Sequence, residues 1–585
     1  MSRRVFALFL ALCCASWRPA PASACGGFFC SSSPVDQNAE RILFSVDDVA
    51  GTTDMIVQIA YQGADDAFAW LLPVATVPQN REVFPSLALS SFDGQSSPVF
   101  QPPPECQRIA YASAGGGPNL NSGADNADSS AHGVTVFVME TVGPYDVAVI
   151  QSDSSDETFQ WLLSNGYRLS SVMKPYIELY TQQKMLFLAI KLTANATTKD
   201  IKPFKMTLPG TTPSIPLRLT AIAAEPEMGV VVWILGQHRY EPANADELVI
   251  PKEELRWRGY GFPVETNWTQ LVAKHVDALG GRGWAVEQAG STSALLQSVS
   301  NTSINTQDQH TAQQALLKLL AGRPYMTRLY SRVSAEEMGY DPSFRRSDKP
   351  DVPRIHDLPY IEEICSRDAG LMPPGHPCDF AACGSLGLCA EAIDPHTSSL
   401  TGACACAPGT SARTVFDAQG SVTVTCQDQR MSFMNPGETD EAGAQFTDPC
   451  VGYSCGDHGK CISMNLTPTC ACDEGYVAVG SLDNAKRQTT CVMPSAQIAK
   501  SFYNRRPPAL SDGMIAGRLV TLAAPMAAPD VAMPTRYGDP APLTPVVSDP
   551  VESKHDGCRA AAGGSACSAG MLLALAWLAR RRRRA

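Results

Sequence analysis

The sequence predicts a sheet-rich α+β domain at the N-terminal side, then two small disulfide-rich modules, a Pro/Ala-rich stalk and a C-terminal transmembrane segment. Three observations predict this order. Strand-like and helical patterns fill residues 25–365, twelve cysteines recur in two groups of six between residues 378 and 491, and the chain ends in an apolar run followed by arginines. Hydrophobic residues make up 44% and charged residues 18% of the 585 residues, a composition typical of folded domains.

The first 24 residues have the features of a secretory signal peptide. Two arginines precede an apolar run over residues 5–14, and the small residues Ala22 and Ala24 stand where signal peptidase requires them. We therefore expect cleavage between Ala24 and Cys25, and export of the chain. Acylation of Cys25, as in a lipoprotein, is the alternative, although that signal normally has leucine where this chain has Ala22.

Residues 25–365 combine strand-like and helical patterns. The strand-like runs are rich in β-branched and aromatic residues, and they cover residues 41–46, 55–61, 134–138, 185–191 and 229–235. Apolar residues at three- and four-residue spacing predict helices over residues 158–164, 172–182, 268–279 and 309–320. More sheet than helix within one region predicts an α+β domain. Residues 113–133 consist mainly of Gly, Ser, Asn, Ala and Asp, so we expect an exposed loop there.

Six short blocks follow one another along this region. They are ACGGFFC at 24–30, PVDQNAER at 34–41, FAWLLP at 68–73, GPYDVA at 143–148, AEPEMG at 224–229 and RLYSRVSAEEM at 328–338. Together they resemble a family known only as domain of unknown function 2330. No activity, substrate or catalytic residue is established for that family, so the resemblance implies a domain over residues 25–365 and no particular chemistry.

Four cysteines in this domain, Cys25, Cys30, Cys106 and Cys365, are consistent with two disulfides in an exported chain. Four residues separate Cys25 from Cys30, a spacing that fits neither a redox C-x-x-C motif nor a usual zinc knuckle. Metal, redox and lipid roles remain the alternatives for these cysteines. Because the nine histidines form no H-E-x-x-H or comparable pair, we expect no metal site and no cofactor.

The two groups of six cysteines have nearly the same spacing. It is C-x4-C-x5-C-x14-C-x-C-x19-C over residues 378–426 and C-x4-C-x5-C-x8-C-x-C-x18-C over residues 450–491. Modules of this size depend on disulfides, and six cysteines allow fifteen pairings. The spacing, with Gly475-Tyr476 after Cys472, resembles epidermal growth factor-like modules, although the first module has Gly409-Thr410 at that step.

That resemblance implies that cysteines one and three, two and four, and five and six are paired. The implied pairs are Cys378–Cys389, Cys383–Cys404 and Cys406–Cys426 in the first module, and Cys450–Cys461, Cys455–Cys470 and Cys472–Cys491 in the second. The residues before Cys450 and the serine at position 463 do not match the calcium-binding class of these modules. We therefore expect no bound calcium.

Motifs for catalysis are absent from the sequence. It has no G-x-S-x-G elbow and no phosphate-binding Gly-rich loop between a strand and a helix. The acidic pairs Asp47-Asp48, Asp65-Asp66 and Glu336-Glu337 resemble the two carboxylates of glycoside hydrolysis, but neighbouring residues on a strand point to opposite faces. A solvated acidic surface is the simpler interpretation, so we expect no catalytic residues.

Charge argues against a nucleic-acid partner. The formal net charge is −12 at pH 7, and it becomes more negative if the arginines of the signal peptide and of the tail are removed. Such a surface repels phosphate backbones, and the sequence has no basic patch with interleaved aromatic residues.

The last part of the chain reads as a stalk followed by an anchor. Residues 494–556 are rich in Pro and Ala, which favour extended conformations and hold folded domains apart. Residues 557–585 contain Cys558, an apolar segment just long enough to span a bilayer, and five terminal arginines that favour the cytoplasmic side. This pattern resembles the myxobacterial C-terminal sorting signal MYXO-CTERM, which implies processing and lipid attachment at Cys558. An ordinary transmembrane anchor is the alternative.

The sequence thus predicts an exported, non-enzymatic envelope or interaction protein. It would be anchored by its C-terminus at the cell surface or outer membrane of a Gram-negative bacterium. Its expected partners are the membrane, through the tail, and an extracellular protein or polysaccharide that the sequence does not identify. The modules would either bind that partner or only space the domain outward. The alternative is an exported enzyme that acts on cell-wall or extracellular polymer through a pocket in residues 25–365, which would require a concave site with converging polar groups.

Overall fold

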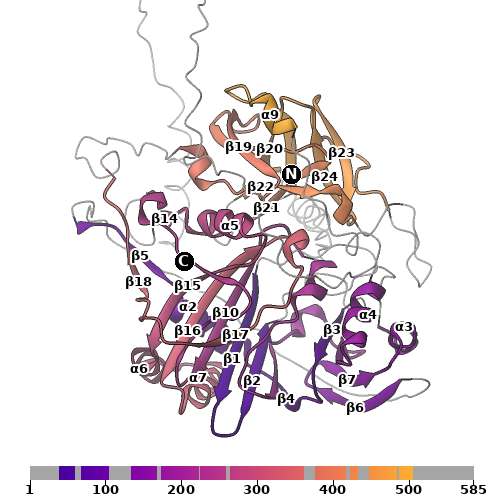
Figure 1. Ribbon diagram of the computed structural model, residues 1–585, viewed down its shortest axis with the longest axis vertical. Helices are drawn as coiled ribbons and strands as arrows, with labels where there is room; N and C mark the ends of the chain where they lie inside the picture. The colour runs from indigo at the N-terminus through magenta and orange to yellow at the C-terminus, as the bar shows by residue number, and fades with distance from the viewer. Residues whose placement is uncertain are drawn as a thin grey trace, which may run out of the picture. The chain divides into compact units, whose positions relative to one another are not determined.

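The structure is a computed structural model (Figure 1). It describes residues 39–58, 68–104, 134–167, 173–222, 224–258, 264–361, 376–416, 422–432, 436, 447–483 and 486–504. Several predicted features lie outside these described residues. They are the signal peptide with Ala24, the four cysteines Cys25, Cys30, Cys106 and Cys365, the loop at 113–133, residues 505–556 of the predicted stalk, and the C-terminal signal with Cys558. The stalk prediction is wrong for residues 494–504, which are folded, because Pro494 bridges to Ala392 and Phe502 is buried.

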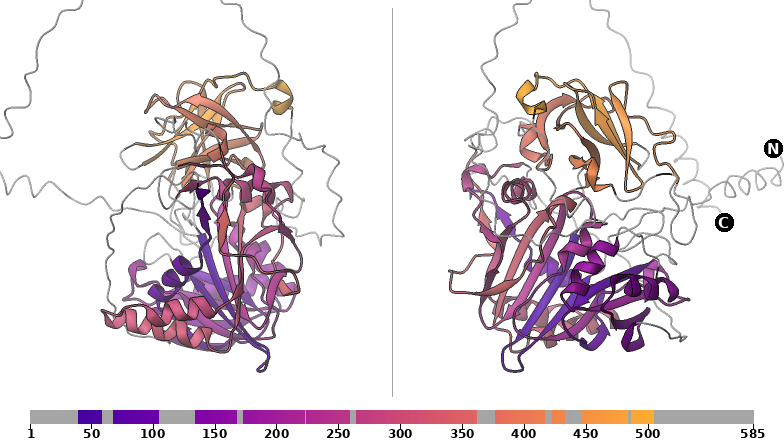
Figure 2. Two further views of the ribbon diagram at one scale, coloured as in Figure 1. Left: turned by 90° about the vertical axis from the view of Figure 1, so that its left-hand side faces the viewer. Right: turned by 45° about the vertical axis from the view of Figure 1, so that its right-hand side comes forward.

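The N-terminal domain is built on a mixed eight-stranded sheet (Figures 1 and 2). In spatial order its strands are β12 (Asp246–Leu248), β15 (Gly283–Ser291), β16 (Tyr325–Val333), β10 (Met228–Gly236), β1 (Ala39–Asp47), β2 (Thr52–Gln58), β9 (Phe204–Pro209) and β4 (Gln79–Val83). Strand β1 is parallel to β10 and β12 is parallel to β15, whereas the other neighbours are antiparallel. All nine residues of β10 are buried, which is typical of an unbroken apolar strand covered on both faces.

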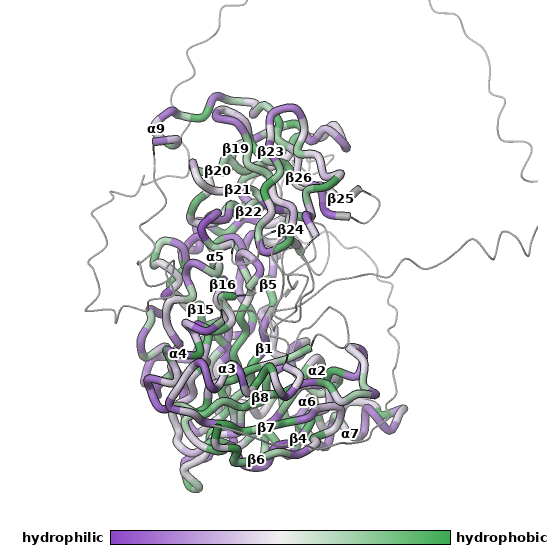
Figure 3. The backbone as a smooth tube through the Cα atoms, turned by 90° about the vertical axis from the view of Figure 1, so that its right-hand side faces the viewer, coloured by the Kyte–Doolittle hydropathy of each residue, from purple (hydrophilic) through white to green (hydrophobic). Residues whose placement is uncertain are grey.

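A second, antiparallel sheet has four strands, two of which, β7 and β8, carry mainly hydrophobic residues (Figure 3). Its order is β3 (Ala69–Val74), β8 (Leu186–Leu192), β7 (Tyr145–Gln151) and β6 (Thr135–Val142). Three further strand pairs complete the described sheet structure of this domain. They are β11 (Arg239–Pro242) with β17 (Phe344–Ser347), β13 (Trp257–Arg258) with β14 (Glu265–Thr266), and β18 (Ile355–Asp357) with β5 (Val99–Gln101).

Helices connect these strands. The described α-helices of this domain are α2 (Ser86–Ser96), α3 (Ser155–Ser164), α4 (Lys174–Gln182), α5 (Trp268–Ala278), α6 (Ser293–Asn301) and α7 (Gln307–Leu320), and α9 (Lys500–Tyr503) follows the cysteine-rich part of the chain. The 3-10 helices are η4 (Thr198–Asp200), η5 (Leu217–Ile222), η6 (Lys252–Glu254), η7 (Ala335–Glu337), η8 (Pro377–Phe380) and η9 (Gln429–Met431). Helix α7 begins two residues before the apolar periodicity does, because Thr306 and Gln309 form a capping box that satisfies its first N–H groups.

Alternate residues of β1 show how the layers are arranged. The side chain of Arg41 pairs with Asp93 of α2, and Trp233, the strand partner of Leu43, packs against Phe92 of the same helix at 5.8 Å between ring centroids. Helices therefore cover this face of the large sheet. Residues on the opposite face of β1 instead border β3, so that the four-stranded sheet covers the other face.

The fold class is confirmed as sheet-rich with some helices. Each of the nine runs predicted from periodicity overlaps an element of the predicted type, although residues 59–61 of the second strand run and residue 172 of the second helical run lie outside the described part of the chain. Within the described ranges, no helix is long and apolar enough to cross a membrane.

The two cysteine groups share their sheets. One sheet has the order β19 (Gly387–Ile393), β20 (Leu400–Cys406), β25 (Val477–Asp483) and β26 (Lys486–Val492). The other has the order β22 (Val422–Asp428), β21 (Thr410–Phe416), β24 (Thr467–Cys472) and β23 (Gly459–Met464). Each sheet thus combines one hairpin of the first group with one hairpin of the second, so the groups form one folded unit. We call the two groups the first and second repeat.

Candidate functional site

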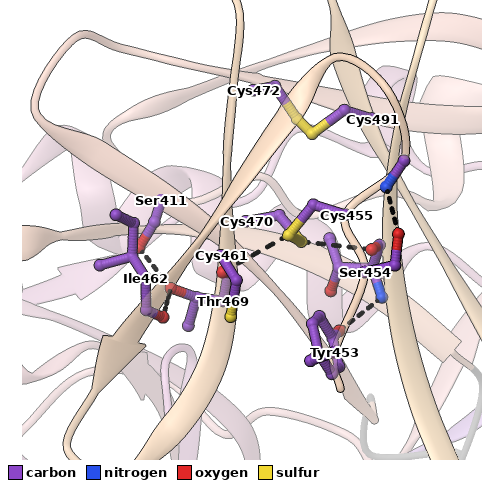
Figure 4. The surroundings of a disulfide bond; sticks show 12 residues. Ser411, Tyr453, Ser454, Cys455, Cys461, Ile462, Thr469, Cys470, Cys472 and Cys491 are labelled. Carbon is purple, nitrogen blue, oxygen red and sulfur yellow. Dashed lines mark hydrogen bonds between the residues drawn. A yellow bond between two sulfur atoms is a disulfide. The ribbon is translucent and has the colours of Figure 1, made fainter. Parts of the chain in front are cut away.

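Six disulfides staple the repeats, and each joins two cysteines of the same repeat. They are Cys378–Cys389, Cys383–Cys404, Cys406–Cys426, Cys450–Cys461, Cys455–Cys470 and Cys472–Cys491. Figure 4 shows part of the second repeat, where Cys470 and Cys472 of strand β24 are bonded to Cys455 and Cys491. This framework is compatible with epidermal growth factor-like modules.

The contact between the repeats is reciprocal. Cys404 of β20 pairs with Ala478 of β25, and Ala412 of β21 pairs with Cys470 of β24. Cys404 and Cys470 are each the fourth cysteine of their repeat, and Ala412 and Ala478 each follow it by eight residues. The same contact is therefore made twice, once in each direction, as in a two-fold symmetric dimer.

Side chains beside these pairs differ between the two halves of the contact. On one side the hydroxyl of Thr469 donates a hydrogen bond to Ser411 at 2.8 Å (Figure 4). At the equivalent positions Ala403 and Val477 are fully buried and apolar. One half of the contact is therefore polar and the equivalent half is apolar. This difference favours a single register between the two repeats.

A buried ion pair links the first repeat to the N-terminal domain. Arg413 of β21 donates a hydrogen bond to the carboxylate of Glu225, and the side chains are 10% and 5% exposed. Burial raises the pKa of Glu225, whereas the neighbouring guanidinium opposes that shift. A pair of this kind is costly to break, because either partner alone would be an uncompensated buried charge.

The acidic pairs considered as catalytic carboxylates are bound in structural contacts. Hydrogen bonding to the backbone of Ala50 and to Arg323 lowers the pKa of Asp47, and Asp48 accepts a hydrogen bond from Arg346. Asp65 and Asp66 lie outside the described residues.

The third pair, Glu336 and Glu337, lies in η7. The carboxylate of Glu337 accepts the N–H of Ser334 at 2.9 Å in a capping box. Burial and neighbouring carboxylates raise the pKa of Glu337 and of Asp277 well above their ordinary values. In the described part of the chain, no group of three His, Cys, Asp or Glu side chains is arranged to hold a metal ion.

A buried polar network crosses the helix-covered face of the large sheet. Arg328 of β16 donates to Glu287 and to Asp93, both at 2.7 Å, and Asp93 also accepts from Arg41 at 3.0 Å. The Arg328 guanidinium lies 5.0 Å from the ring centroid of Trp233. Because the charges are matched and enclosed, this network serves the packing of strands on helix α2.

A cavity of about 200 Å³ lies between the large sheet and the four-stranded sheet. Strands β1, β2, β9 and β3 and the segment from Pro209 to Pro216 supply most of its lining, which is largely apolar. At its polar end the Tyr180 hydroxyl lies 3.0 Å from both carboxylate oxygens of Asp341, and the backbone N–H of Arg218 donates to the same carboxylate at 3.1 Å. Burial raises the pKa of Asp341.

The N-terminal part of the chain matches a known protein family. The model described as an uncharacterised protein conserved in bacteria, DUF2330, matches residues 19–345, more than half of the 585 residues. The chain belongs to the DUF2330 family. Strand β18, at residues 355–357, pairs with β5 at residues 99–101, so the described domain continues beyond the matched residues.

Comparisons with individual proteins add no functional assignment to this DUF2330 protein. No curated protein sequence is significantly similar to it. The crystal structure of a mutated baculovirus P35 after caspase cleavage is similar over 40% of this chain and 81% of that chain, with 11% sequence identity and a TM-score of 0.21. A similarity this low carries no argument about fold or function.

The described parts of the blocks that carry the DUF2330 resemblance lie in the centre of the domain. They supply Arg41 on β1, strand β3, the turn before Tyr145 on β7, the segment containing Glu225 before β10, and Arg328 on β16. Several of these residues make the buried polar contacts described above. The described parts of these blocks therefore contribute buried contacts that stabilise the fold.

Sequence reasoning did not identify the half-buried carboxylate of Asp341 or the buried carboxylate of Glu40 in this DUF2330 domain. Asp341 follows Tyr340 in a segment without clear periodicity, and nothing in the sequence places it beside Tyr180. Glu40 gave a signal, because it is in phase with Ile42 and Phe44 on a strand with a buried face. A carboxylate in phase with apolar residues indicates a buried charge.

Proposed function

We propose that this chain is an exported, non-enzymatic envelope or interaction protein that is anchored at the cell surface by its C-terminal tail. The signal peptide features of residues 1–24 and the Cys558 signal support export and anchoring. The repeats and the DUF2330 domain form the exposed part, and its partner would be an extracellular protein or a polysaccharide.

The hydrogen-bonded state of Asp47, Asp48 and Asp341 carries the non-enzymatic part of the proposal. Asp47 and Asp48 are held in ion pairs, and Asp341 is already hydrogen-bonded by Tyr180 and the backbone. General acid–base catalysis needs a titratable group that is free to reach the substrate. A largely apolar cavity of about 200 Å³ favours retention of a small ligand over cleavage of a polymer.

The repeats supply the surface suited to a partner. Ile393 and Leu400 face each other across the β19–β20 hairpin and are 52% and 49% exposed. Met493, 69% exposed, precedes the residue that bridges to Ala392. Apolar side chains gathered on neighbouring strands of a rigid sheet are typical of a protein contact.

Fractionation of cells tests the anchoring. Wild type should be labelled by a membrane-impermeant reagent on intact cells and should lack Arg580–Arg584, whereas Cys558→Ala should stay in the inner membrane with its arginines. Cys567→Ala, a cysteine within the apolar stretch, is the matched control and should behave as wild type. Identical fractionation of wild type and Cys558→Ala would contradict the sorting mechanism.

A substrate screen tests the absence of catalysis. The purified full-length chain should not cleave peptidoglycan, polysaccharide, ester or peptide substrates. Turnover that is lost in Asp341→Asn but kept in Asp308→Asn, with both variants folded, would overturn the non-enzymatic proposal and favour the exported enzyme.

A further inference from the structure

We propose that the N-terminal domain binds a primary amine on a short unbranched alkyl chain. The ammonium group would contact Glu40, and the alkyl chain would occupy the cavity between β1–β2 and β3. This inference goes beyond the proposed function, because it concerns a small ligand and does not depend on where the chain is anchored.

The first observation is that Glu40 is buried and that one of its carboxylate oxygens has no hydrogen-bond partner. The residue is 6% exposed, and its Oε2 atom makes no hydrogen bond. It borders a void of about 10 Å³, close to the smallest space that holds a water molecule. Leaving a carboxylate buried and unpaired is unfavourable, so a group that both donates hydrogen bonds and carries positive charge would stabilise it.

Among the described residues, those that line the void supply no cation for Glu40. Around the void, β2 contributes Met55 and Val57, β3 contributes Trp70, Leu71 and Leu72, and η5 with the residues before it contributes Ile215, Pro216, Leu219 and Thr220. None of these side chains titrates. Burial alone raises the pKa of Glu40 to about 7, so the carboxyl can be ionised at neutral pH.

The second observation is that the void adjoins the larger cavity. Met55, Leu72 and Pro216 line both spaces. Glu40 and Phe44 are four residues apart on β1, which corresponds to about 13 Å along the strand. A ligand with its ammonium group at Glu40 would therefore extend its chain toward Phe44, and the flexible side chain of Met55 is suited to move aside for it.

The chemistry of the site selects among apolar ligands. An alkyl carboxylate would be repelled by ionised Glu40, and an alcohol could donate a hydrogen bond but would leave the negative charge uncompensated. A primary amine donates hydrogen bonds and also compensates the negative charge, because its pKa, like that of lysine, keeps it protonated at neutral pH. The apolar lining around Phe44, Met55 and Leu208 then favours an alkyl chain.

Calorimetric titration of the purified full-length chain with octylamine, octanol and octanoate tests the proposal. At pH 8 octylamine should bind at least tenfold more tightly than either analogue. Glu40→Gln should weaken octylamine binding at least tenfold, whereas Asp308→Asn, an exposed carboxylate on α7, should leave it unchanged. No binding of octylamine, or equal binding of octanoate, would overturn the proposal.

The pH dependence separates a direct contact from an effect on folding. In wild type the affinity for octylamine should rise about tenfold per pH unit from pH 5 to pH 7 and then level off, since the ligand binds only ionised Glu40. Glu40→Gln should show no such slope while circular dichroism shows it folded. A wild-type affinity that is independent of pH over this range would contradict a role for Glu40.

Discussion

The hydroxyl of Thr414 in the first repeat lies 2.8 Å from the hydroxyl of Thr489 in the second repeat, and both side chains are buried. The equivalent place in the other half of the contact is occupied by Gly480 and Val424. A Cβ atom at Gly480 would lie 2.8 Å from Val424 Cγ2 and 2.9 Å from Thr414 Oγ1. The glycine therefore lets the two repeats approach each other closely.

We predict that Gly480→Ala destabilises the repeats. Both facing side chains are β-branched and cannot easily move away, so overpacking should lower the free energy of unfolding by about 1–3 kcal/mol. Urea unfolding monitored by circular dichroism would measure this. Gly339→Ala serves as a control, because a Cβ there meets no atom within 4 Å. An equal effect of the two substitutions would show that close approach is not what Gly480 provides.

Loss of one disulfide should also destabilise the other repeat. The double variant Cys472→Ser, Cys491→Ser should cost about 2–5 kcal/mol. Because β24 and β25 pair with strands of the first repeat, amides of β20 and β21 should also exchange faster with deuterium. Unchanged exchange in β20 and β21 would mean that the repeats are stable independently.

The buried network around Arg328 should contribute far more to stability than an exposed ion pair. Arg328→Met leaves the buried carboxylate of Glu287 without its cation and the half-buried Asp93 with Arg41 alone, and we expect a loss of about 3–5 kcal/mol in chemical denaturation. Arg345→Met removes an arginine that is 62% exposed, and it should cost about 1 kcal/mol or less. Similar losses for the two variants would contradict this account.

Glu40 should make stability depend on pH in a definite direction. Its pKa is about 7 in the folded chain against an ordinary value of 4.5, so the folded state binds the extra proton between these values. The stability that protonated Glu40 contributes is therefore present below pH 4.5 and is lost as the pH rises to 7, by about 3 kcal/mol in total.

The variant Glu40→Gln resembles the protonated state and should lack this loss. Wild type and Glu40→Gln should be about equally stable at pH 4, and the variant should be the more stable of the two at pH 8. Unfolding free energies measured at both pH values without added ligand would check this. A constant difference between them would mean that Glu40 does not titrate in this range.

Local patterns in the sequence predicted those parts of the fold that depend on local interactions. The runs predicted at residues 41–46 and 229–235 correspond to β1 and β10, because a short apolar run rich in β-branched residues is typical of a buried strand. Helix α2 was missed, since its sequence is rich in serine and contains Gly94, which weakens the amphipathic pattern. Its place is determined by tertiary contacts, such as the one between Phe92 and Trp233.

The non-local features could not be predicted from sequence patterns. Cysteine spacing implied bonds within each repeat, but nothing in the spacing indicated that Cys404 would lie opposite Ala478. Strand pairing across 74 residues depends on which edges are free once each hairpin has formed. The same holds for the candidate cavity, whose lining comes from strands that are distant in the sequence.

The reciprocal pairing of the repeats has a consequence for biogenesis. If the chain is exported as proposed, it enters an oxidising compartment from its N-terminus, and the first repeat arrives there before the second. Its own disulfides can close at that stage, but β20 and β21 retain free edges, which are prone to join the wrong partner. Arrival of β24 and β25 covers both edges in one step. A chain truncated between residues 432 and 447 should therefore form its disulfides but aggregate through the unpaired edges of β20 and β21. Duplication or loss of one repeat alone would also leave strand edges without a partner.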